Sequence, residues 1–406
     1  MKMKYTISLV LTYLLLLFVY PESWGQGKTD LDTLRGIQWS YQSNGPIHGS
    51  PLVLDGVLYA GSNDKHLYAL DIQSGDLLWK FKSAGAIKST PAASPNLICF
   101  TADDGFLYAL DKHKGQLIWK FDMQGEEKQD IWDYYLSSPV FDRGVIYIGS
   151  GMGGFYALNA EDGSLSWSFS AGGMIHSTPV VDEEKVYFGS YDGWFYGLNR
   201  SDGSLVWKFN TIGQRWFPKG AVQCGAALHE NTLYFGSRDF NIYALNKETG
   251  TGMWNRYEQG SWVIATPLIK DTLLLFGTSD SHRFYALDRR SGKVIWETPL
   301  NLNVFGEAAA GNRLVYFGSL DGKLYALDLS NGNIQWTFQT QASKTNWNQV
   351  FDRNNHLRKD LFQNPDATAQ KVYSTIHSLG SILSTPVLHE GKLYFGSMNG
   401  KIYCLH

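Results

Sequence analysis

The chain has 406 residues, with 35 Lys and Arg against 38 Asp and Glu, which gives a formal charge of −3 at pH 7. The balance and the lack of a basic tract argue against a nucleic-acid-binding protein. Aromatic residues make up 15% and charged residues 18% of the chain, a composition typical of β-rich proteins with a large core.

The first 25 residues predict a secretory signal peptide. Lys2 and Lys4 precede an apolar run at 5–20, and the small residues Ser23 and Gly25 stand three and one before a predicted cleavage ahead of Gln26. The alternative is an uncleaved anchor helix, but the run is shorter than the roughly 20 residues that span a bilayer. No Cys lies near the predicted cleavage to carry a lipid anchor. We expect an exported protein of the periplasm or cell surface, with peripheral membrane association left open.

One short phrase then recurs along the chain: Tyr, two small or apolar residues, Asp or Asn, a turn with Gly, and Trp eleven residues after the Tyr. It occupies 68–79, 108–119, 156–167, 196–207, 243–254, 285–296 and 325–336. The eighth Tyr is Tyr403, close to the last residue, and the matching eighth Trp is Trp39 near the other end. Such a circular permutation predicts a closed ring of eight repeats.

Each repeat is predicted to form four short strands, as at 177–181, 185–190, 194–198 and 204–209. Four-stranded antiparallel blades around an axis make a β-propeller, an all-β fold. We therefore predict one eight-bladed propeller over 26–406, closed by pairing of the stretch at 37–41 with the strands at 384–405. An insertion at 339–383 before blade eight is expected to hold short helices.

The repeated residues have structural roles in this prediction. The glycines, such as Gly75, permit a positive φ in the turn before the Trp. Asp71 and its equivalents start that turn, and the Asp residues between the second and third strands, such as Asp64, form the next one. The blade tryptophans are expected to pack between neighbouring blades: Trp39, Trp79, Trp119, Trp167, Trp207, Trp254, Trp296 and Trp336. Cys99, Cys224 and Cys404 give neither a disulfide framework nor a metal pattern, so buried free thiols are expected.

The string Tyr-Ala-Leu-Asp-x-x-x-Gly-x-x-x-Trp resembles the pyrroloquinoline-quinone (PQQ) repeat with its tryptophan-docking motif, over nearly all of 39–406. The resemblance implies an eight-bladed propeller. One branch of these proteins, the quinoprotein dehydrogenases, binds PQQ and calcium above the ring and carries an adjacent Cys-Cys pair that this chain lacks. The other branch holds non-enzymatic propellers such as the propeller component of the outer-membrane barrel-assembly machinery. Those are similar to this chain in length, blade count and export, although they usually carry a lipobox Cys.

Two features of the repeat predict where a site lies. Three connections between blades are long, at 122–136, 210–223 and 339–383, and long loops often carry function. The innermost strands also differ at equivalent positions. One residue before the usual Pro stand Ser50, Thr90, Ser138, Thr178, Gly225, Thr266, Glu307 and Thr385. Three residues before it stand His48, Lys88, Leu136, His176, Gln223, Ile264, Phe305 and Leu383.

We predict a ligand- or partner-binding site at the mouth of the central channel, formed by the polar inner residues and walled by aromatic ones. It comprises His48, Lys88, Trp132, Tyr135, His176, Trp216, Gln223, Trp262 and Glu307. The alternative is that these side chains line a water-filled channel. No metal-binding pattern is present, so neither metal nor cofactor is expected.

The function predicted is that of an exported, non-catalytic scaffold. It would bind a protein or peptide of the cell envelope at the loop-rich face or at a blade edge. One alternative is a quinoprotein oxidoreductase that uses PQQ and calcium. Another is a protein that acts on polysaccharide with Glu307 as acid or base, which needs a second carboxylate within about 5–10 Å.

Overall fold

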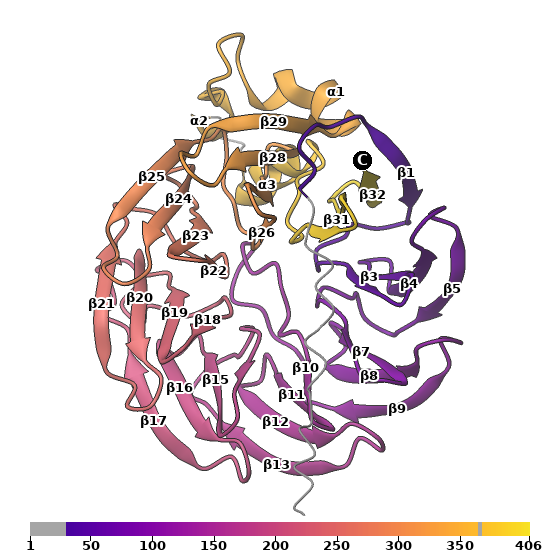
Figure 1. Ribbon diagram of the computed structural model, residues 1–406, viewed down its shortest axis with the longest axis vertical. Coiled ribbons are helices and arrows are strands. Elements are labelled where there is room, and N and C mark those ends of the chain that lie inside the picture. The colour runs from indigo at the N-terminus through magenta and orange to yellow at the C-terminus, as the bar shows by residue number, and fades with distance from the viewer. Residues whose placement is uncertain (1–29, 364–367) are drawn as a thin grey trace, which may run out of the picture.

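A computed structural model describes residues 30–363 and 368–406. The predicted signal peptide lies outside the described residues. The chain forms eight four-stranded antiparallel sheets arranged as a ring (Figure 1). The fold class predicted from the sequence, an eight-bladed β-propeller, is thus confirmed.

The blades follow one another along the chain, each running from its innermost to its outermost strand. Blade one is β2 (Leu52–Leu54), β3 (Val57–Gly61), β4 (His66–Asp71) and β5 (Leu77–Lys82). Blade two is β6 (Ala92–Ala93), β7 (Leu97–Thr101), β8 (Phe106–Asp111) and β9 (Leu117–Asp122). Blade three is β10 (Val140–Asp142), β11 (Val145–Gly149), β12 (Gly154–Asn159) and β13 (Leu165–Ser170). Blade four is β14 (Val180–Val181), β15 (Lys185–Gly189), β16 (Trp194–Asn199) and β17 (Leu205–Asn210).

The other four blades repeat this pattern. Blade five is β18 (Ala227–His229), β19 (Thr232–Gly236), β20 (Asn241–Asn246) and β21 (Gly252–Tyr257). Blade six is β22 (Leu268–Lys270), β23 (Leu273–Gly277), β24 (Arg283–Asp288) and β25 (Val294–Pro299). Blade seven is β26 (Ala309–Ala310), β27 (Leu314–Gly318), β28 (Lys323–Asp328) and β29 (Ile334–Gln339). Blade eight is β30 (Val387–His389), β31 (Lys392–Gly396), β32 (Lys401–Leu405) and β1 (Ile37–Gln42).

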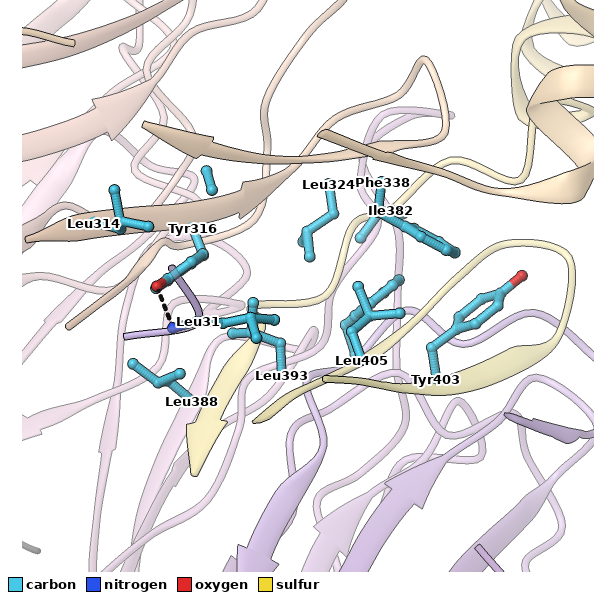
Figure 2. Packing of buried hydrophobic residues seen from close by; sticks show 12 residues of the cluster. Leu31, Leu314, Tyr316, Leu324, Phe338, Ile382, Leu388, Leu393, Tyr403 and Leu405 are labelled. Carbon is cyan, nitrogen blue, oxygen red and sulfur yellow. Dashed lines mark hydrogen bonds between the residues drawn. The ribbon is translucent and has the colours of Figure 1, made fainter. Parts of the chain in front are cut away.

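Blade eight closes the ring by joining the two ends of the described chain in one sheet (Figure 1). Trp39 lies opposite Cys404 and Ser40 opposite Tyr403 in the pairing of β1 with β32. The segment before β1 adds to the joint, because the buried Leu31 packs between blades seven and eight and its backbone N–H donates to the Tyr316 hydroxyl at 2.9 Å (Figure 2). The predicted closure is confirmed, and it makes the ring continuous from the last blade to the first.

The blade tryptophans bind the following blade through a polar contact as well as by packing. The Nε1–H of Trp39 donates to the carbonyl of Ile72 at 3.0 Å, and six other blade tryptophans make the equivalent bond. The indole of Trp39 also covers Gly75, where an added Cβ would lie 2.6 Å from ring atoms. These turn glycines are therefore needed for their lack of a side chain as well as for their positive φ.

The turn carboxylates between the second and third strands have two roles, of which the sequence predicted one. Asp64 accepts from the backbone N–H of His66 at 3.0 Å, which forms the turn, and also from the hydroxyl of Tyr68 at 2.5 Å. The same Tyr–Asp bond recurs in blades two, four, five and seven. In these five blades the recurrent Tyr of the sequence phrase is thus a buried side chain whose hydroxyl donates to the turn of its own blade, whereas the hydroxyls of Tyr156 and Tyr285 donate to Met123 and Glu258.

The described residues of the insertion before blade eight form three helices: α1 (Gln341–Val350), α2 (Asp360–Gln363) and α3 (Ala369–His377). The Thr340 side chain caps α1 by accepting from the backbone N–H of Ser343 at 3.1 Å, and Thr368 caps α3 in the same way. Within the described part of the chain, the helices are too short and too polar for any of them to cross a membrane. The three cysteines are buried and free, as predicted.

Candidate functional site

The polar residues of the inner strands are paired within their own blades. In three blades, the polar side chain three residues before the usual Pro contacts a side chain in the turn between the second and third strands of the same blade. The two residues are fifteen positions apart in each case. These pairs are His48 with Asn63 (3.0 Å), Lys88 with Asp103, and Gln223 with Arg238 (2.9 Å). The corresponding residues in blades seven and eight, such as Phe305 and Leu383, are apolar and belong to one core cluster. Blades six to eight therefore form the apolar half of the channel end, and Leu136 of blade three is an apolar exception in the other half.

His176, in blade four, forms a buried cluster with residues from a distant loop. Its Nδ1 lies 2.9 Å from Asp133 and its Nε2 lies 2.7 Å from Glu126, and Tyr191 donates to Asp133 at 2.7 Å. Burial by itself would lower the pKa of His176, but the bonds to the two carboxylates outweigh it and raise this pKa to about 9. His176 is therefore a cation at neutral pH.

This charge makes stability depend on pH. A raised pKa means that the contribution of His176 is complete below its ordinary pKa of 6.5 and is lost as the pH rises through about 9. By linkage, the loss between these values is about 3 kcal/mol. We expect the free energy of unfolding of the wild type to fall relative to that of His176→Gln over this range, as measured by urea titration from pH 6 to 10. Parallel curves for the two proteins would contradict the assignment of charge.

The loop that supplies these carboxylates, residues 123–136 between β9 and β10, is called the strap here. Besides Glu126 and Asp133, the strap places Asp130 against Arg238, with the closer oxygen at 2.5 Å. The Arg238 guanidinium lies over the rings of Tyr191 and Trp262, with its central carbon 5.2 and 4.6 Å from their centroids. The strap is thereby held on blades four and five by ionic contacts that are largely desolvated.

The strap and α3 meet over the apolar half of the channel end. Tyr134 is buried and its hydroxyl lies 3.0 Å from Nε2 of His377. The Tyr134 ring stacks on Tyr373 of α3 and packs against Phe305 of blade seven, with centroids 5.9 and 5.5 Å apart. Tyr135 donates to the backbone carbonyl of Leu383 at 2.7 Å. The chain thus covers this end of the channel with its own side chains.

Burial under the strap and α3 lowers the pKa values of three basic side chains at this end of the channel. Burial, with further repulsion from Lys88 and His377, lowers the pKa of His48 to about 3. Burial lowers the pKa of Lys88 to about 8, although Asp103 opposes the shift. Burial also lowers the pKa of His377 to about 4. Both imidazoles are therefore neutral at pH 7.

The predicted site residues do not all meet in one place. Beneath the strap lies a small cavity of about 90 Å³, and four predicted residues line it: Tyr135, His176, Gln223 and Glu307. His48, Lys88, Trp132 and Trp262 are not among its lining residues. Trp216 lies outside it, on the loop before blade five, and is 71% exposed. Whether these residues bind a ligand stays a prediction.

The loop around Trp216 is an ordered hairpin, here called the 212–219 hairpin. Gln214 and Phe217 exchange two backbone hydrogen bonds of 3.1 and 2.9 Å, which leaves Arg215 and Trp216 at the tip. Phe217 anchors the hairpin against Trp262, with ring centroids 5.1 Å apart. Beside the tip is a pocket of about 280 Å³, whose lining includes Tyr191, Phe217, Lys219 and Arg238 as well as Trp216. The sequence predicted Trp216 in the wall of the channel, because the direction in which a loop projects cannot be read from its composition.

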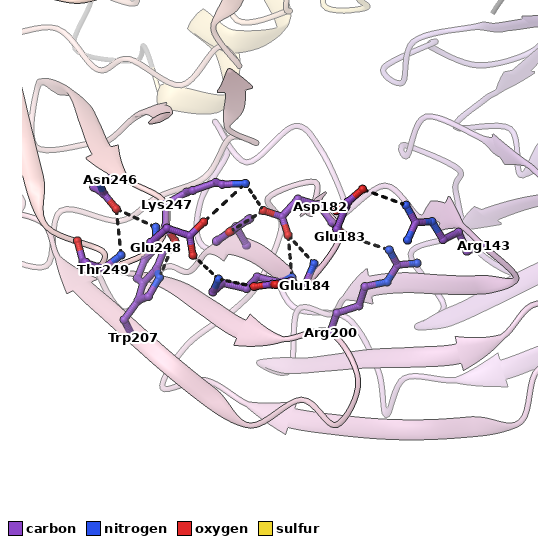
Figure 3. Close-up of polar contacts among 12 residues, drawn as sticks. Arg143, Asp182, Glu183, Glu184, Arg200, Trp207, Asn246, Lys247, Glu248 and Thr249 are labelled. Atoms are coloured by element: carbon purple, nitrogen blue, oxygen red, sulfur yellow. Dashed lines mark hydrogen bonds and ion pairs between the residues drawn. The ribbon is translucent and has the colours of Figure 1, made fainter. Parts of the chain in front are cut away.

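A second polar cluster joins blades three, four and five through residues at the turns and ends of their strands (Figure 3). Asp182 accepts from Lys247 at 2.9 Å, and Lys185 donates to Glu248 at 2.5 Å. Arg200 donates to the hydroxyl of Tyr147 at 3.0 Å. These contacts join neighbouring blades and are remote from the strap, so they serve the ring and not the channel.

The ring of repeats and its blade geometry define the class of protein, a PQQ-repeat β-propeller. A family model described as outer membrane protein assembly factor BamB matches residues 31–103, 103–215 and 213–364. The chain belongs to this family.

Individual relatives match only in part. BamB of Legionella pneumophila is 25% identical over 156 residues, which is 35% of this chain and 40% of that protein. The quinoprotein alcohol dehydrogenase PedH of Pseudomonas putida is 39% identical over 83 residues, 18% of this chain and 14% of PedH. The dehydrogenase subunit of the quinone alcohol dehydrogenase of Gluconobacter oxydans is 34% identical over 97 residues, 21% of this chain and 12% of the subunit. The matches thus span less than half of each of these relatives.

Solved structures show the same fold at low identity. BamB from Moraxella catarrhalis superposes with a TM-score of 0.66 and 15% identity, over 92% of this chain and all of that one. Quinohemoprotein alcohol dehydrogenase from Comamonas testosteroni gives 0.70 and 13%, over 94% of this chain and 77% of that one. The computationally designed Ika8 protein gives 0.66 and 13%, over 90% and 97%. Because BamB, an alcohol dehydrogenase and a designed protein match about equally, these likenesses establish the fold alone.

The cavity under the strap does not fit a quinone cofactor with calcium. The cavity under the strap, at about 90 Å³, is far smaller than the roughly 300–1,000 Å³ of pockets that hold such ligands. The described residues contain no group of three or more His, Cys, Asp or Glu placed to hold a metal ion. The space above the ring is taken by Tyr134, Tyr135 and α3. No reaction step through such a cofactor is derived for this chain.

Proposed function

We propose that this protein is an exported, non-catalytic scaffold of the cell envelope that takes part in outer-membrane protein assembly by binding a partner protein. Membership of the BamB family supports the role. The observation that carries the binding surface is the 71% exposure of Trp216 at the tip of the 212–219 hairpin. Exposing so large an aromatic side chain is costly in water, and its burial by a partner recovers that cost.

The hairpin has the composition and rigidity of a protein-binding surface. Ile212 is also strongly exposed, at 66%. The Arg215 guanidinium lies over the Trp216 ring with its central carbon 5.1 Å from the centroid, so both are held at the tip. Trp, Tyr and Arg are the residues most often found at the energetic centre of interfaces. The pocket of about 280 Å³ next to Trp216 would accept one large side chain of the partner.

Photo-crosslinking tests this surface. A photoreactive phenylalanine analogue placed at Trp216 is expected to capture an envelope protein in the host cell, because the side chain lies inside the interface. Met253 provides a matched control, since it is 56% exposed but lies on the outer strand β21. Mass spectrometry identifies the captured protein. The proposal fails if position 216 captures nothing, or if both positions give the same products.

A binding measurement with the captured partner adds a second check. Trp216→Ala is expected to weaken binding by about tenfold or more, as for the central aromatic residue of an interface. Its free energy of unfolding should change by less than about 0.5 kcal/mol, because the side chain is exposed. Thermal unfolding separates the two effects, and a large loss of stability would show that the tryptophan serves the fold.

The quinoprotein alternative is favoured by the short matches to dehydrogenases, and a titration decides it. We expect no stoichiometric uptake of PQQ in the presence of calcium, as followed by the absorption spectrum of the protein after dialysis. Retention of one quinone per chain would overturn the scaffold proposal. The polysaccharide alternative has less support, because Glu307 is the one carboxylate among the described residues lining the cavity, and glycoside hydrolysis needs two.

A further inference from the structure

A ring of eight residues, seven of which carry a side chain, divides the central channel into two spaces. These are the residues one before the usual Pro of each innermost strand, namely Ser50, Thr90, Ser138, Thr178, Gly225, Thr266, Glu307 and Thr385. All eight line the cavity of about 90 Å³ under the strap, and all eight also line a second space of about 410 Å³. The ring is therefore the common wall of the two spaces.

The second space, here called the funnel, lies on the side away from the strap. Beyond the ring, its walls are formed by the residues that follow along the innermost strands, which are Pro51, Pro91, Pro139, Pro179, Val180, Ala226 and Val387. These walls are apolar and, because most are prolines, stiff. The strap and α3 cover the opposite end of the channel. A molecule that reaches the ring from solvent thus enters through the partly open funnel.

The ring presents oxygen atoms to this entrance. Six of its eight members carry hydroxyl groups, and in three of them the hydroxyl oxygen accepts a backbone N–H of a neighbouring blade, as in the 2.8 Å bond from Thr385 to Ser50. A hydroxyl oxygen has two lone pairs, so each retains acceptor capacity. Glu307 is the sole ionisable residue among the described residues that line the funnel. Closure of a blade does not require a carboxylate there, because the other seven blades use a hydroxyl or glycine.

We propose that the funnel binds a primary alkylammonium group, supplied by a lysine side chain of a protein partner. The aliphatic part of the side chain would lie along the prolines, and its three N–H donors would reach the hydroxyl oxygens and the Glu307 carboxylate. A compact ammonium suits a ring of separate acceptors better than the planar guanidinium of Arg, which favours paired oxygens on one group. Only the choice of a protein as the source rests on the proposed scaffold function, because the funnel faces away from the strap and shares no lining residue with the pocket beside the 212–219 hairpin.

Saturation-transfer NMR with a short peptide tests the proposal, since it detects weak binding. The probe is acetyl-Gly-Gly-Lys-Gly-Gly-amide, with norleucine and arginine analogues and free n-butylamine as comparisons. We expect transfer to the lysine side-chain methylenes, none to norleucine, and weaker transfer to arginine. Glu307→Gln should weaken binding by about tenfold or more, as for loss of a charged hydrogen-bond acceptor. The matched control Glu183→Gln, at a side chain 87% exposed outside the funnel, should leave it unchanged.

A second variant keeps the test decisive if Glu307→Gln alters the fold. Thr385→Val preserves shape but removes one hydroxyl of the ring, and it should also weaken lysine binding. Lysine binding that survives both variants would overturn the site. Binding of n-butylamine without binding of the peptide would overturn the lysine source. Trp216→Ala should not affect lysine binding, and loss of crosslinking at the hairpin would leave it intact, so the two proposals fail separately.

Discussion

Replacement of Trp39 by Ala is expected to destabilise the protein by about 3–5 kcal/mol, the usual cost of deleting a buried tryptophan. The indole is 8% exposed, bonds to the carbonyl of Ile72 and covers Gly75 of blade one. It also belongs to the core cluster that joins blade eight to blade one. Its loss therefore removes packing at the point where the ring closes. Urea unfolding followed by tryptophan fluorescence and circular dichroism measures the change.

Trp207 is a matched control inside the ring. It is likewise 8% exposed, and its Nε1–H donates to the carbonyl of Lys247 at 2.9 Å. Because β1 is a full member of blade eight, Trp39→Ala and Trp207→Ala should cost similar amounts and unfold in one transition. A small effect of Trp39→Ala beside a large effect of Trp207→Ala would show that the terminal strand does not secure the ring.

Removal of the Asp133 carboxylate is expected to have the other large effect. Asp133→Ala would leave the His176 imidazolium with Glu126 alone and would leave the Tyr191 hydroxyl without its acceptor. The Asp133 side chain is fully buried. Breaking a buried ion pair on one side costs about 3–5 kcal/mol, because an uncompensated charge remains. Denaturant unfolding at pH 7 measures the loss.

Local loss of hydrogen-exchange protection distinguishes this prediction from a general loss of stability. Hydrogen exchange should show the strap losing protection more than the outer blade strands, because Asp133 holds the strap on blade four. Asp162→Ala is the matched control, since that carboxylate lies in an exposed turn and caps it by accepting from the backbone N–H of Ser164 at 2.9 Å. The control should cost about 1 kcal/mol or less. Equal losses in the two variants would contradict the role given to the buried cluster.

Asp133 also sets the acid limit of this cluster. Burial opposes its ionisation, but the bonds from His176 and Tyr191 outweigh burial and lower the pKa of its carboxyl. Its contribution is therefore present above the ordinary pKa of 3.8 and is lost as the pH falls through the lowered value. Asp133 and His176 together therefore contribute most to stability between the ordinary pKa of Asp, 3.8, and the ordinary pKa of His, 6.5.

The repeat explains why so much of the fold could be predicted. Seven of the eight repeats carry a turn-forming Asp or Asn, a Gly and a Trp at fixed spacing, and these residues act within one blade or on the next. The closure of the ring could also be predicted, because the stretch around Trp39 supplies the outermost strand and the Trp that the repeat with Tyr403 lacks. These are short-range rules repeated eight times, so an error in one blade is corrected by the others.

Less of the candidate site could be predicted, because its surroundings lie outside the repeat. His176 and Glu307 stand out as departures from the repeat, and both line the central cavity. Their surroundings come from insertions that obey no repeat, however. Asp130 pairs with Arg238 across 108 residues, and Tyr134 meets His377 across 243. No spacing in the sequence records such contacts.

The sequence by itself determined the number of blades, the order of their strands and the place where the ring closes, because local turn chemistry and the constant Tyr-to-Trp spacing fix each repeat. Only the tertiary structure decided that the strap and α3 cover one end of the channel, that Trp216 lies outside it and that the hydroxyl ring faces a funnel at the other end. Those outcomes depend on where irregular loops pack, and packing between distant segments follows from shape and charge that no repeat encodes.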